Sequence, residues 1–382
     1  MPAFQDYFDE SHQLVRDSVR RFVEREILPS IADWEEAEEF PRELYLKAGA
    51  AGILGIGYPE RFGGSHEGDL FAKVAASEEL MRSGSGGLVA GLGSLDIGLP
   101  PIVKWAKPAI RDRVVPQVLC GEKIMALAVT EPSGGSDVAS LKTRAVRDGD
   151  CYRVTGSKTF ITSGVRADYY TVAVRSGGEG FGGVSLLLIE KGTPGFSVGR
   201  KLKKMGWWAS DTAELFFDDC RVPVENLIGV ENMGFAGIMA NFQSERLSLA
   251  LMANMTAQLA LEESLKWASQ REAFGKPIGK FQVLKHRLAE MATQLEVSRE
   301  FTYRQAAKMA AGKSVIKEIS MAKNFATDIA DRIVYDAVQI AGGMGYMRES
   351  LVERLYRDNR ILSIGGGTRE VMNEIISKQM GL

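Results

Sequence analysis

The spacing of apolar residues changes twice along this chain of 382 residues. From about residue 9 to 119, apolar residues such as Val15, Val19 and Phe22 recur at helical intervals. From 124 to about 228 the pattern is that of short strands, with Asp148-Gly149-Asp150 between two of them as a hairpin signal. After residue 229 the helical spacing returns and continues to the end.

This order of patterns predicts the fold class. The middle segment does not alternate strands with helices, so a doubly wound nucleotide-binding fold is not expected. We expect an α+β protein with an N-terminal helical domain (1–123), a middle antiparallel β-barrel or sandwich (124–231) and a C-terminal helical domain (232–382). Three long helical patterns, 233–270, 282–311 and 314–341, suggest that the last domain is a four-helix bundle.

Charge, cysteine content and hydropathy exclude several classes of protein. The formal net charge of −2 gives no strongly basic field for nucleic acid. Three scattered cysteines argue against a disulfide framework and against zinc, and we expect no metal. No run approaches the ~18–20 apolar residues of a membrane span, and Met1–Asp6 do not resemble a signal peptide. We therefore expect a soluble cytoplasmic protein, or the mature form of a protein of an organelle matrix.

A loop rich in glycine and hydroxyl groups follows the first expected strand. Residues 128–137 read Ala-Val-Thr-Glu-Pro-Ser-Gly-Gly-Ser-Asp. Glycine lets a ligand approach the main chain closely, so such a loop suits a flat, polar-edged cofactor or a phosphate. An ordinary turn can have the same composition, and the loop alone does not decide between the two.

The order of the motifs favours the cofactor, because it resembles that of the acyl-CoA dehydrogenase family. The loop at 128–137 resembles the flavin-binding signature of that family, and Gly156–Thr162 resembles its second flavin segment. The later motifs follow in family order over nearly the whole chain: Ala213–Phe217, Val222-Pro223, Arg271–Lys276 with Gln282, Gln339 with Gly342–Tyr346, Arg357-Asp358 and Gly367-Thr368.

The resemblance implies FAD-dependent α,β-dehydrogenation of an acyl-CoA thioester to the trans-2-enoyl-CoA. A carboxylate takes the α proton, and the β hydrogen leaves as hydride to flavin N5. The family passes the electrons to an electron-transferring flavoprotein, in the catabolism (β-oxidation) of fatty or branched-chain acyl groups, and is built as a homotetramer, a dimer of dimers. Two alternatives remain open: an acyl-CoA oxidase or flavin monooxygenase that uses oxygen, and a non-catalytic subunit that binds acyl-CoA or flavin.

The position of the catalytic base separates this chain from many relatives. The commonest position, just before the Gly-Thr pair, is occupied here by Gly366. Enzymes of the isovaleryl and long-chain type carry the base on the first long C-terminal helix instead, and Glu245 occupies that position. Helical spacing independently places Phe242, Leu249 and Met252 on the face of Glu245.

A carboxylate in such an apolar stripe is costly unless it is paired or protonated. A salt bridge to a neighbouring helix is therefore the alternative to catalysis for Glu245. Gly366 keeps its backbone N–H, which in the family helps to bind the enolate oxygen. Three successive glycines at 365–367 are either a flexible loop end or space left for a branched or bulky acyl group.

The resemblance assigns the remaining site residues. Those that line or flank the flavin are Leu127, Ala128, Val129, Thr130, Ser136, Phe160, Ile161, Thr162, Thr368 and Glu370. Those that reach the FAD of a neighbouring subunit are Arg271, Phe274, Gln282, Gln339, Gly342 and Gly343. Those that contact the substrate are Ser136, Arg246 and Gly366. Many relatives carry Trp at position 160, and Phe keeps an aromatic face there but lacks the indole donor.

Overall fold

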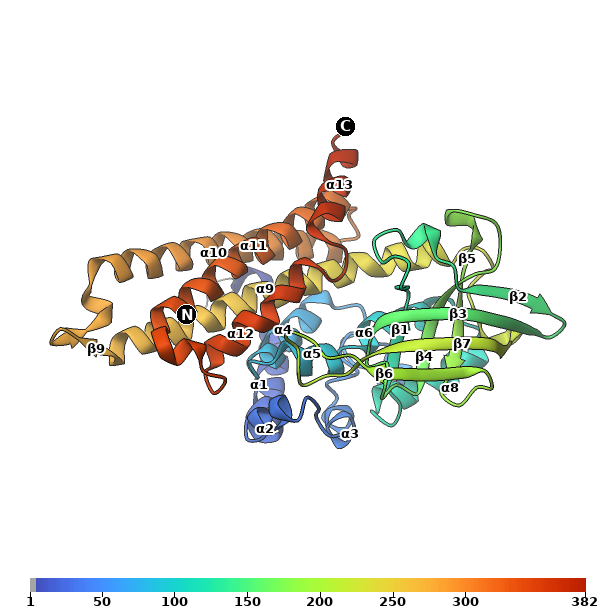
Figure 1. Cartoon of the computed structure of the whole chain (residues 1–382), viewed down its shortest axis with the longest axis horizontal. Coiled ribbons are helices and arrows are strands. Elements are labelled where there is room, and N and C mark those ends of the chain that lie inside the picture. Colours follow the sequence, from blue (N-terminus) through green and yellow to red (C-terminus); the bar gives the residue numbers. More distant parts are fainter. Residues whose placement is uncertain (1–4) are drawn as a thin grey trace.

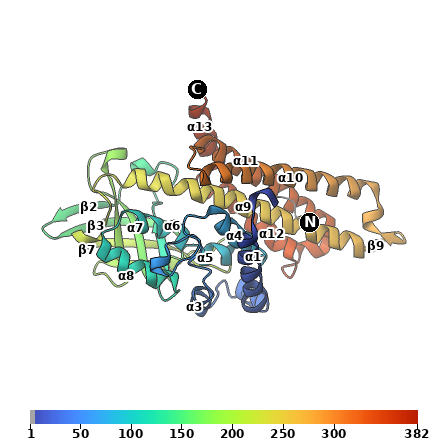
Figure 2. The same cartoon turned by 180° about the vertical axis from the view of Figure 1, so that it is seen from behind.

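The computed structural model describes residues 5–382, so Met1–Phe4, on which part of the signal-peptide prediction rests, lie outside the described residues. Helices near the N-terminus lie between a β-sheet region at one end of the molecule and a long helical bundle that extends to the other end (Figure 1, and from behind in Figure 2). The predicted boundaries at 123/124 and 231/232 lie between α8 and β1 and between β8 and α9. The α+β class is confirmed.

Eight helices form the N-terminal part of the described chain. They are α1 (Glu10–Phe22), α2 (Ile31–Glu36), α3 (Glu43–Ala50), α4 (Leu70–Met81), α5 (Gly86–Leu92), α6 (Leu95–Gly98), α7 (Pro100–Trp105) and α8 (Pro108–Leu119). We expect a loop over Ser83–Gly87, but the structure ends that loop earlier, because α5 begins at Gly86. The Ser85 hydroxyl caps this helix by accepting a hydrogen bond of 3.1 Å from the Leu88 N–H.

The middle part is one sheet with mostly antiparallel pairing. Its strands are β1 (Met125–Ala128), β2 (Arg144–Asp148), β3 (Cys151–Thr162), β4 (Tyr169–Arg175), β5 (Val184–Glu190), β6 (Phe196–Lys201), β7 (Thr212–Pro223) and β8 (Leu227–Ile228). Their order is β6-β7-β3-β2-β4-β5-β8, with β1 on β4. The predicted hairpin is the β2–β3 pair, whereas β1 and β2 both meet β4 in parallel, which the sequence does not predict.

The C-terminal part is built around α9 (Gly234–Gln270), which packs against α4, α10 (Gln282–Ala310), α11 (Ile316–Ala341) and α12 (Leu351–Asn359). The predicted bundle is thus three long helices with the shorter α12 as the fourth, while α13 (Arg369–Gln379) projects from it (Figure 1). Asn254 interrupts the apolar surface of α9, yet it is buried and satisfied: it donates to Thr302 Oγ1 at 3.1 Å and accepts from Ser298 Oγ at 2.6 Å.

No single helix within residues 5–382 has the length and apolar character needed to cross a membrane; one bent pair, α5 with Leu95–Trp105, reaches the threshold by length and composition alone.

Candidate active site

Glu245 lies on α9 with its carboxyl group enclosed by protein. Its Oε2 atom is buried and has no hydrogen-bond partner. Burial raises the pKa of this carboxyl group, and the nearby cations Lys323 and Arg246 oppose the shift. Within residues 5–382 the side chain makes no ion pair, so the salt bridge that the sequence leaves open is not observed there. The carboxylate is therefore free to act on a ligand.

Gly366 faces this carboxylate from the turn before α13. A β-carbon at Gly366 would lie 3.6 Å from both Cγ and Cδ of Glu245 and 2.6 Å from Cδ1 of Leu249. The backbone at Gly366 is left-handed, with φ of 62°, a conformation that glycine adopts readily. The structure thus brings together two residues that are 121 positions apart, as the assignment of both to one site requires.

Two buried cations hold the carbonyl groups of this turn. Arg246 Nε donates to the oxygen of Gly366 at 3.3 Å, and Lys323 Nζ on α11 donates to the oxygen of Gly367 at 2.5 Å. Lys323 is fully buried, and burial lowers its pKa to about 8 against the attraction of Glu245. The two cations therefore fix the turn opposite Glu245 and place positive charge beside it.

Glu245 opens into a cavity of about 560 Å³ between α9 and the N-terminal helices. On α9 the lining runs from Ala240 to Met252, a span of roughly 18 Å at the rise of an α-helix. The opposite wall comes from α4 to α7, and Thr162 and Trp207 extend it from the β region. Most of the lining is apolar, and Leu249 and Met252 share the wall with Glu245, as the helical spacing predicts, whereas Phe242 does not line the cavity.

The loop at 128–137 is fixed by a buried ion pair. Lys158 on β3 donates from Nζ to Glu131 Oε1 at 2.8 Å and to the oxygen of Val129 at 2.9 Å. The Glu131 carboxylate also accepts the N–H groups of Lys142 and Thr143, at 2.6 and 2.9 Å. Burial lowers the pKa of Lys158 to about 8. Although burial opposes it, Lys158 and these hydrogen bonds lower the pKa of Glu131. This network gives the loop a defined shape.

The predicted flavin residues of this region differ in what they expose. The side chains of Ala128, Val129 and Ile161 are buried in the core, so that only their main chain can meet a ligand. Thr162 lines the cavity. The ring of Phe160 is 68% exposed on a left-handed backbone with φ of 59°. An exposed aromatic face on a strained residue is typical of a ligand contact.

The residues predicted to serve a neighbouring subunit lie at the far end of the bundle. Arg271 follows α9 directly, roughly 39 Å along the helix from Glu245. Phe274 and Gly275 form the tight turn between β9 (Glu272–Ala273) and β10 (Lys276–Pro277), where the Phe274 ring is 96% exposed (β9 in Figure 1). Arg287 of α10 bonds Asp336 of α11 at 2.8 Å. Gln282 and Gln339 therefore lie near the same end, where Gly342 and Gly343 have open space around them.

These placements fit a large flat cofactor that carries a pyrophosphate. The exposed rings of Phe160 and Phe274 offer apolar faces, and Gly342 and Gly343 leave their main chain open to close approach. Arg271 offers a planar fork suited to phosphate oxygens. Thr368 and Glu370 lie at the start of α13, where the Thr368 hydroxyl accepts the Val371 N–H at 3.3 Å. Ser136 is exposed on the anchored loop.

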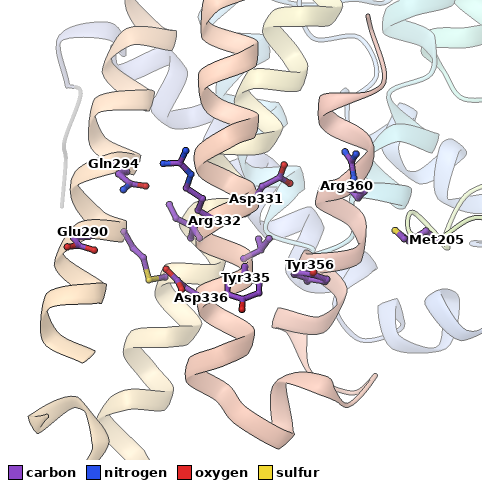
Figure 3. A pocket seen from close by; sticks show the side chains of 12 residues that line it. Met205, Glu290, Gln294, Asp331, Arg332, Tyr335, Asp336, Tyr356 and Arg360 are labelled. Carbon is purple, nitrogen blue, oxygen red and sulfur yellow. The ribbon is translucent and has the colours of Figure 1, made fainter. Parts of the chain in front are cut away.

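A second cavity of about 590 Å³ lies on the outer face of α10, α11 and α12. Figure 3 shows Glu290 and Gln294 reaching it from α10, with Arg332, Tyr335 and Asp336 from α11. None of the site residues predicted from the sequence lines it. The rings of Tyr335 and of Tyr356 on α12 are largely exposed along this face.

Three residues near the site were not assigned a role from the sequence. Lys323 sits one helix away from Glu245, Trp207 lines the cavity, and Asp358 holds the main chain of Trp207. A lysine with zero exposure in a helix is unusual. For Asp358, the Arg357-Asp358 motif is the signal in the sequence that could have pointed to it.

Comparisons with known proteins identify the family of this chain. Family models described as the N-terminal, middle and C-terminal domains of acyl-CoA dehydrogenase match residues 9–122, 126–220 and 232–381. An acyl-CoA dehydrogenase of Bacillus subtilis is 40% identical over 369 residues, which cover 96% of this chain and 97% of that protein. The mitochondrial long-chain specific acyl-CoA dehydrogenase of Sus scrofa is 39% identical, over 98% of this chain and 87% of its own.

Two further similar proteins are a subunit of an Etf complex and a protein of known crystal structure. The CarC subunit of the caffeyl-CoA reductase-Etf complex of Acetobacterium woodii is 37% identical over 97% of this chain and 98% of its own. The crystal structure of a probable acyl-CoA dehydrogenase from Mycobacterium abscessus matches with a TM-score of 0.96 and 52% identity, over 98% of this chain and all of that one. The chain therefore belongs to the acyl-CoA dehydrogenase family of flavoprotein oxidoreductases.

Proposed function

We propose that this protein is an FAD-dependent dehydrogenase that removes the α and β hydrogens of an acyl-CoA thioester, with Glu245 as the base. One observation carries the proposal. The Glu245 carboxyl is buried in an apolar cavity, has an oxygen without a hydrogen-bond partner, and lies opposite Gly366. A carboxylate kept in this way is a base whose pKa is raised toward working pH.

The roles of the chain's own residues follow from this geometry. Glu245 takes the α proton, and the apolar cavity excludes water from the reacting carbons. The backbone N–H of Gly366 donates to the thioester oxygen as negative charge develops there. Arg246 and Lys323 hold the carbonyl groups of Gly366 and Gly367 and so keep the turn in place. A bound flavin would supply the acceptor for the β hydrogen, which leaves as a hydride.

The cofactor is held by two sets of residues. The 127–130 and 160–162 segments, Ser136, Thr368 and Glu370 would hold the FAD of their own chain. Arg271, Phe274, Gln282, Gln339, Gly342 and Gly343 would hold that of a neighbour in a homotetramer. Their distance from Glu245 supports this division, and so do the exposed apolar side chains Val283, Tyr335, Tyr346 and Tyr356 on the bundle.

The acyl group and the electron acceptor are inferred from the cavity and the relatives. The long apolar lining supports an apolar acyl chain, straight or branched, and the Sus scrofa relative is named as long-chain specific. The CarC relative is named as part of an Etf complex, which supports an electron-transferring flavoprotein as the physiological acceptor. Ser136 would contact the CoA part of the substrate, and Arg246 would fix the pocket or the end of the substrate.

Anaerobic titration of the yellow protein with a panel of acyl-CoAs tests the proposal. The wild type should bleach its flavin and pass electrons to a dye or flavoprotein. Glu245→Gln keeps the shape, and flavin reduction should slow by ~10²–10⁴-fold with FAD and acyl-CoA still bound. Bleaching by Glu245→Gln at the wild-type rate would disprove the role of Glu245. Peroxide formation in air would indicate an oxidase, and a flavin that stays oxidised with every acyl-CoA would indicate a binding subunit.

A further inference from the structure

Trp207 lines the cavity in a strained backbone conformation. Its φ is 55°, in the left-handed region that a residue with a β-carbon rarely adopts. Such strain persists only where the surroundings hold it, and it is concentrated at functional sites and ligand clamps. Trp207 shares the cavity wall with Thr162 and with Val89 of α5. The contacts around Trp207 must therefore hold its main chain in this conformation.

Asp358 on α12 holds the main chain of Trp207. Its Oδ1 atom accepts the Trp207 N–H at 2.5 Å, and its Oδ2 atom accepts the Gly86 N–H at 3.0 Å. The side chain is almost completely buried. One carboxylate thus ties together the loop before β7, the first residue of α5 and α12, which come from the three parts of the chain.

Three glycines let the segment around Trp207 pack closely on α5 and α12. A β-carbon at Gly86 would lie 2.4 Å from Nε1 of Trp207, and one at Gly87 would lie 2.7 Å from its carbonyl carbon. A β-carbon at Gly206 would lie 2.4 Å from the carbonyl oxygen of Arg357. At Gly87 and Gly206 the β-carbon would meet backbone atoms, which cannot yield at these distances, so both positions require glycine in this arrangement. The indole itself lies against Gly86.

A second layer of contacts fixes Arg357, the neighbour of Asp358 on α12. Arg357 donates to Glu35 Oε2 at 2.9 Å, and Glu35 Oε1 accepts the Ser85 hydroxyl at 2.6 Å. The guanidinium of Arg357 also stacks on the ring of Trp208, 3.6 Å from its centroid. Trp208 does not line the cavity. The two adjacent tryptophans therefore differ in role: one forms the cavity wall and the other supports the junction.

We propose that Trp207 determines which acyl groups fit the cavity, and that Asp358 is the positioning residue that fixes its indole. The inference rests on the proposed function, because it takes the cavity as the acyl site. A fixed aromatic wall admits a straight chain and opposes bulk that would need the ring to move. This assigns a role to the Arg357-Asp358 motif, which the dehydrogenation chemistry does not use.

Equilibrium binding tests the proposal without turnover. In a Glu245→Gln background with FAD bound, calorimetry gives the Kd of octanoyl-CoA, cyclohexanecarbonyl-CoA and 3-phenylpropionyl-CoA, which carry a ring at two positions. Trp207→Leu should improve the binding of at least one ring-bearing ligand relative to octanoyl-CoA by about 10-fold or more. Asp358→Asn should change the same ratio in the same direction by less. Trp208→Leu removes an aromatic ring from the junction but not from the cavity wall, and it should change the ratio by no more than Asp358→Asn does.

The outcomes separate this inference from the proposed function. Flavin bleaching tests the role of Glu245 by comparing the wild type with Glu245→Gln. The Kd ratios test the role of Trp207 and are measured entirely in the Glu245→Gln background, where bleaching is blocked. An unchanged ratio in Trp207→Leu, an equal change in Trp208→Leu, or no acyl-CoA binding in any variant would overturn the role of Trp207. If Trp207→Leu does not fold, Trp207→Phe provides the same comparison with a smaller change, and an unchanged ratio there has the same meaning.

Discussion

Glu245 and Gly366 lie directly against one another: a β-carbon on Gly366 would lie 3.6 Å from the carboxyl carbon of Glu245. The two positions come from different elements, the middle of α9 and the turn before α13. A carboxylate on either element would thus reach the same region of the cavity. Glycine at one position leaves space for the glutamate at the other.

Moving the base to position 366 should restore part of the activity. In Glu245→Gly with Gly366→Glu, the new carboxylate starts from the turn before α13 and should reach the same α carbon. Its β-carbon would meet Cδ1 of Leu249 at 2.6 Å, and a left-handed glutamate costs roughly 1–2 kcal/mol. We expect partial recovery of anaerobic flavin reduction over Glu245→Gly alone, with altered chain-length preference.

Leu249 supplies the control for this experiment. Adding Leu249→Ala to the relocated pair removes the clash and should raise recovery, whereas Leu249→Ala in the wild type should only weaken binding of the acyl chain. Recovery that is absent both with and without Leu249→Ala would show that a carboxylate at 366 cannot reach the substrate.

A smaller change at the same place should alter substrate shape preference. Gly366→Ala places a methyl group between Leu249 and Glu245, where a bulky or branched acyl group would need room. Flavin reduction by branched acyl-CoAs should fall more than reduction by a short straight one, and a single methylene-sized change in a pocket is worth about 10-fold or more. Gly365→Ala is the matched control, because its β-carbon would meet only the Ile361 oxygen, at 3.6 Å. Equal losses for both acyl classes would remove the steric argument.

Lys323 should set the pH at which Glu245 becomes a base. The groups that act on the Glu245 carboxylate by charge are Lys323 from α11 and Arg246 from its own helix, and both lower its pKa against the effect of burial. The remaining charged residues of the cavity, Glu67, Lys73, Asp96 and Lys104, line it from the N-terminal region. Lys323→Met removes one positive charge, so the pKa of Glu245 should rise.

The pH profile of flavin reduction measures this effect. In the wild type the rate should rise with pH as Glu245 loses its proton, and in Lys323→Met this rise should move to higher pH. Lys317→Met, a more exposed lysine of the same helix, should leave it in place. A slower Lys323→Met enzyme whose profile keeps its position would mean that Lys323 acts only by holding the Gly367 carbonyl.

The same lysine should make the stability of the protein depend on pH. Burial lowers the pKa of Lys323 in the folded protein to about 8, below its ordinary value of 10.5, so the folded protein binds fewer protons than the unfolded chain between these values. Unfolding free energy should therefore rise with pH across this window. Urea denaturation of Lys323→Met should show a smaller rise of the unfolding free energy with pH than the wild type shows. An equal rise would mean that another group causes the pH dependence.

Local periodicity explains how much of the fold could be predicted. The limits of α9 and the face shared by Glu245, Leu249 and Met252 follow from a 3.6-residue repeat, which the sequence contains directly. The β2–β3 hairpin follows in the same way from its turn residues. By contrast, the parallel pairing of β1 with β4 joins strands over 40 residues apart, for which no local pattern exists.

The parts of the site that the sequence does not predict also depend on contacts between residues far apart in the chain. Asp358 meets Trp207 across 151 positions, and Lys323 reaches Gly367 across 44. Neither residue differs in type from an ordinary helical surface residue, and only the packed structure shows that both are buried. The sequence pattern of Gly86 and Gly87 predicts a loop, but in the structure these glycines make room for the distant Trp207, Gly86 for its indole and Gly87 for its main chain.

Arg271 should control cofactor retention and assembly together. The side chain lies at the hairpin of β9 and β10, too far from Glu245 along α9 to serve the same site. If it meets the pyrophosphate of a neighbour, Arg271→Ala removes a hydrogen bond to a charged group, worth roughly 1.5–3 kcal/mol. Dialysis should then release FAD more readily, and sedimentation should shift from about four chain masses toward smaller species. Lys266→Ala, an exposed change at the same end of α9, should alter neither measurement. Unchanged FAD affinity and an intact assembly in Arg271→Ala would contradict the shared site, and a stable wild-type monomer with full FAD occupancy would contradict the tetramer itself.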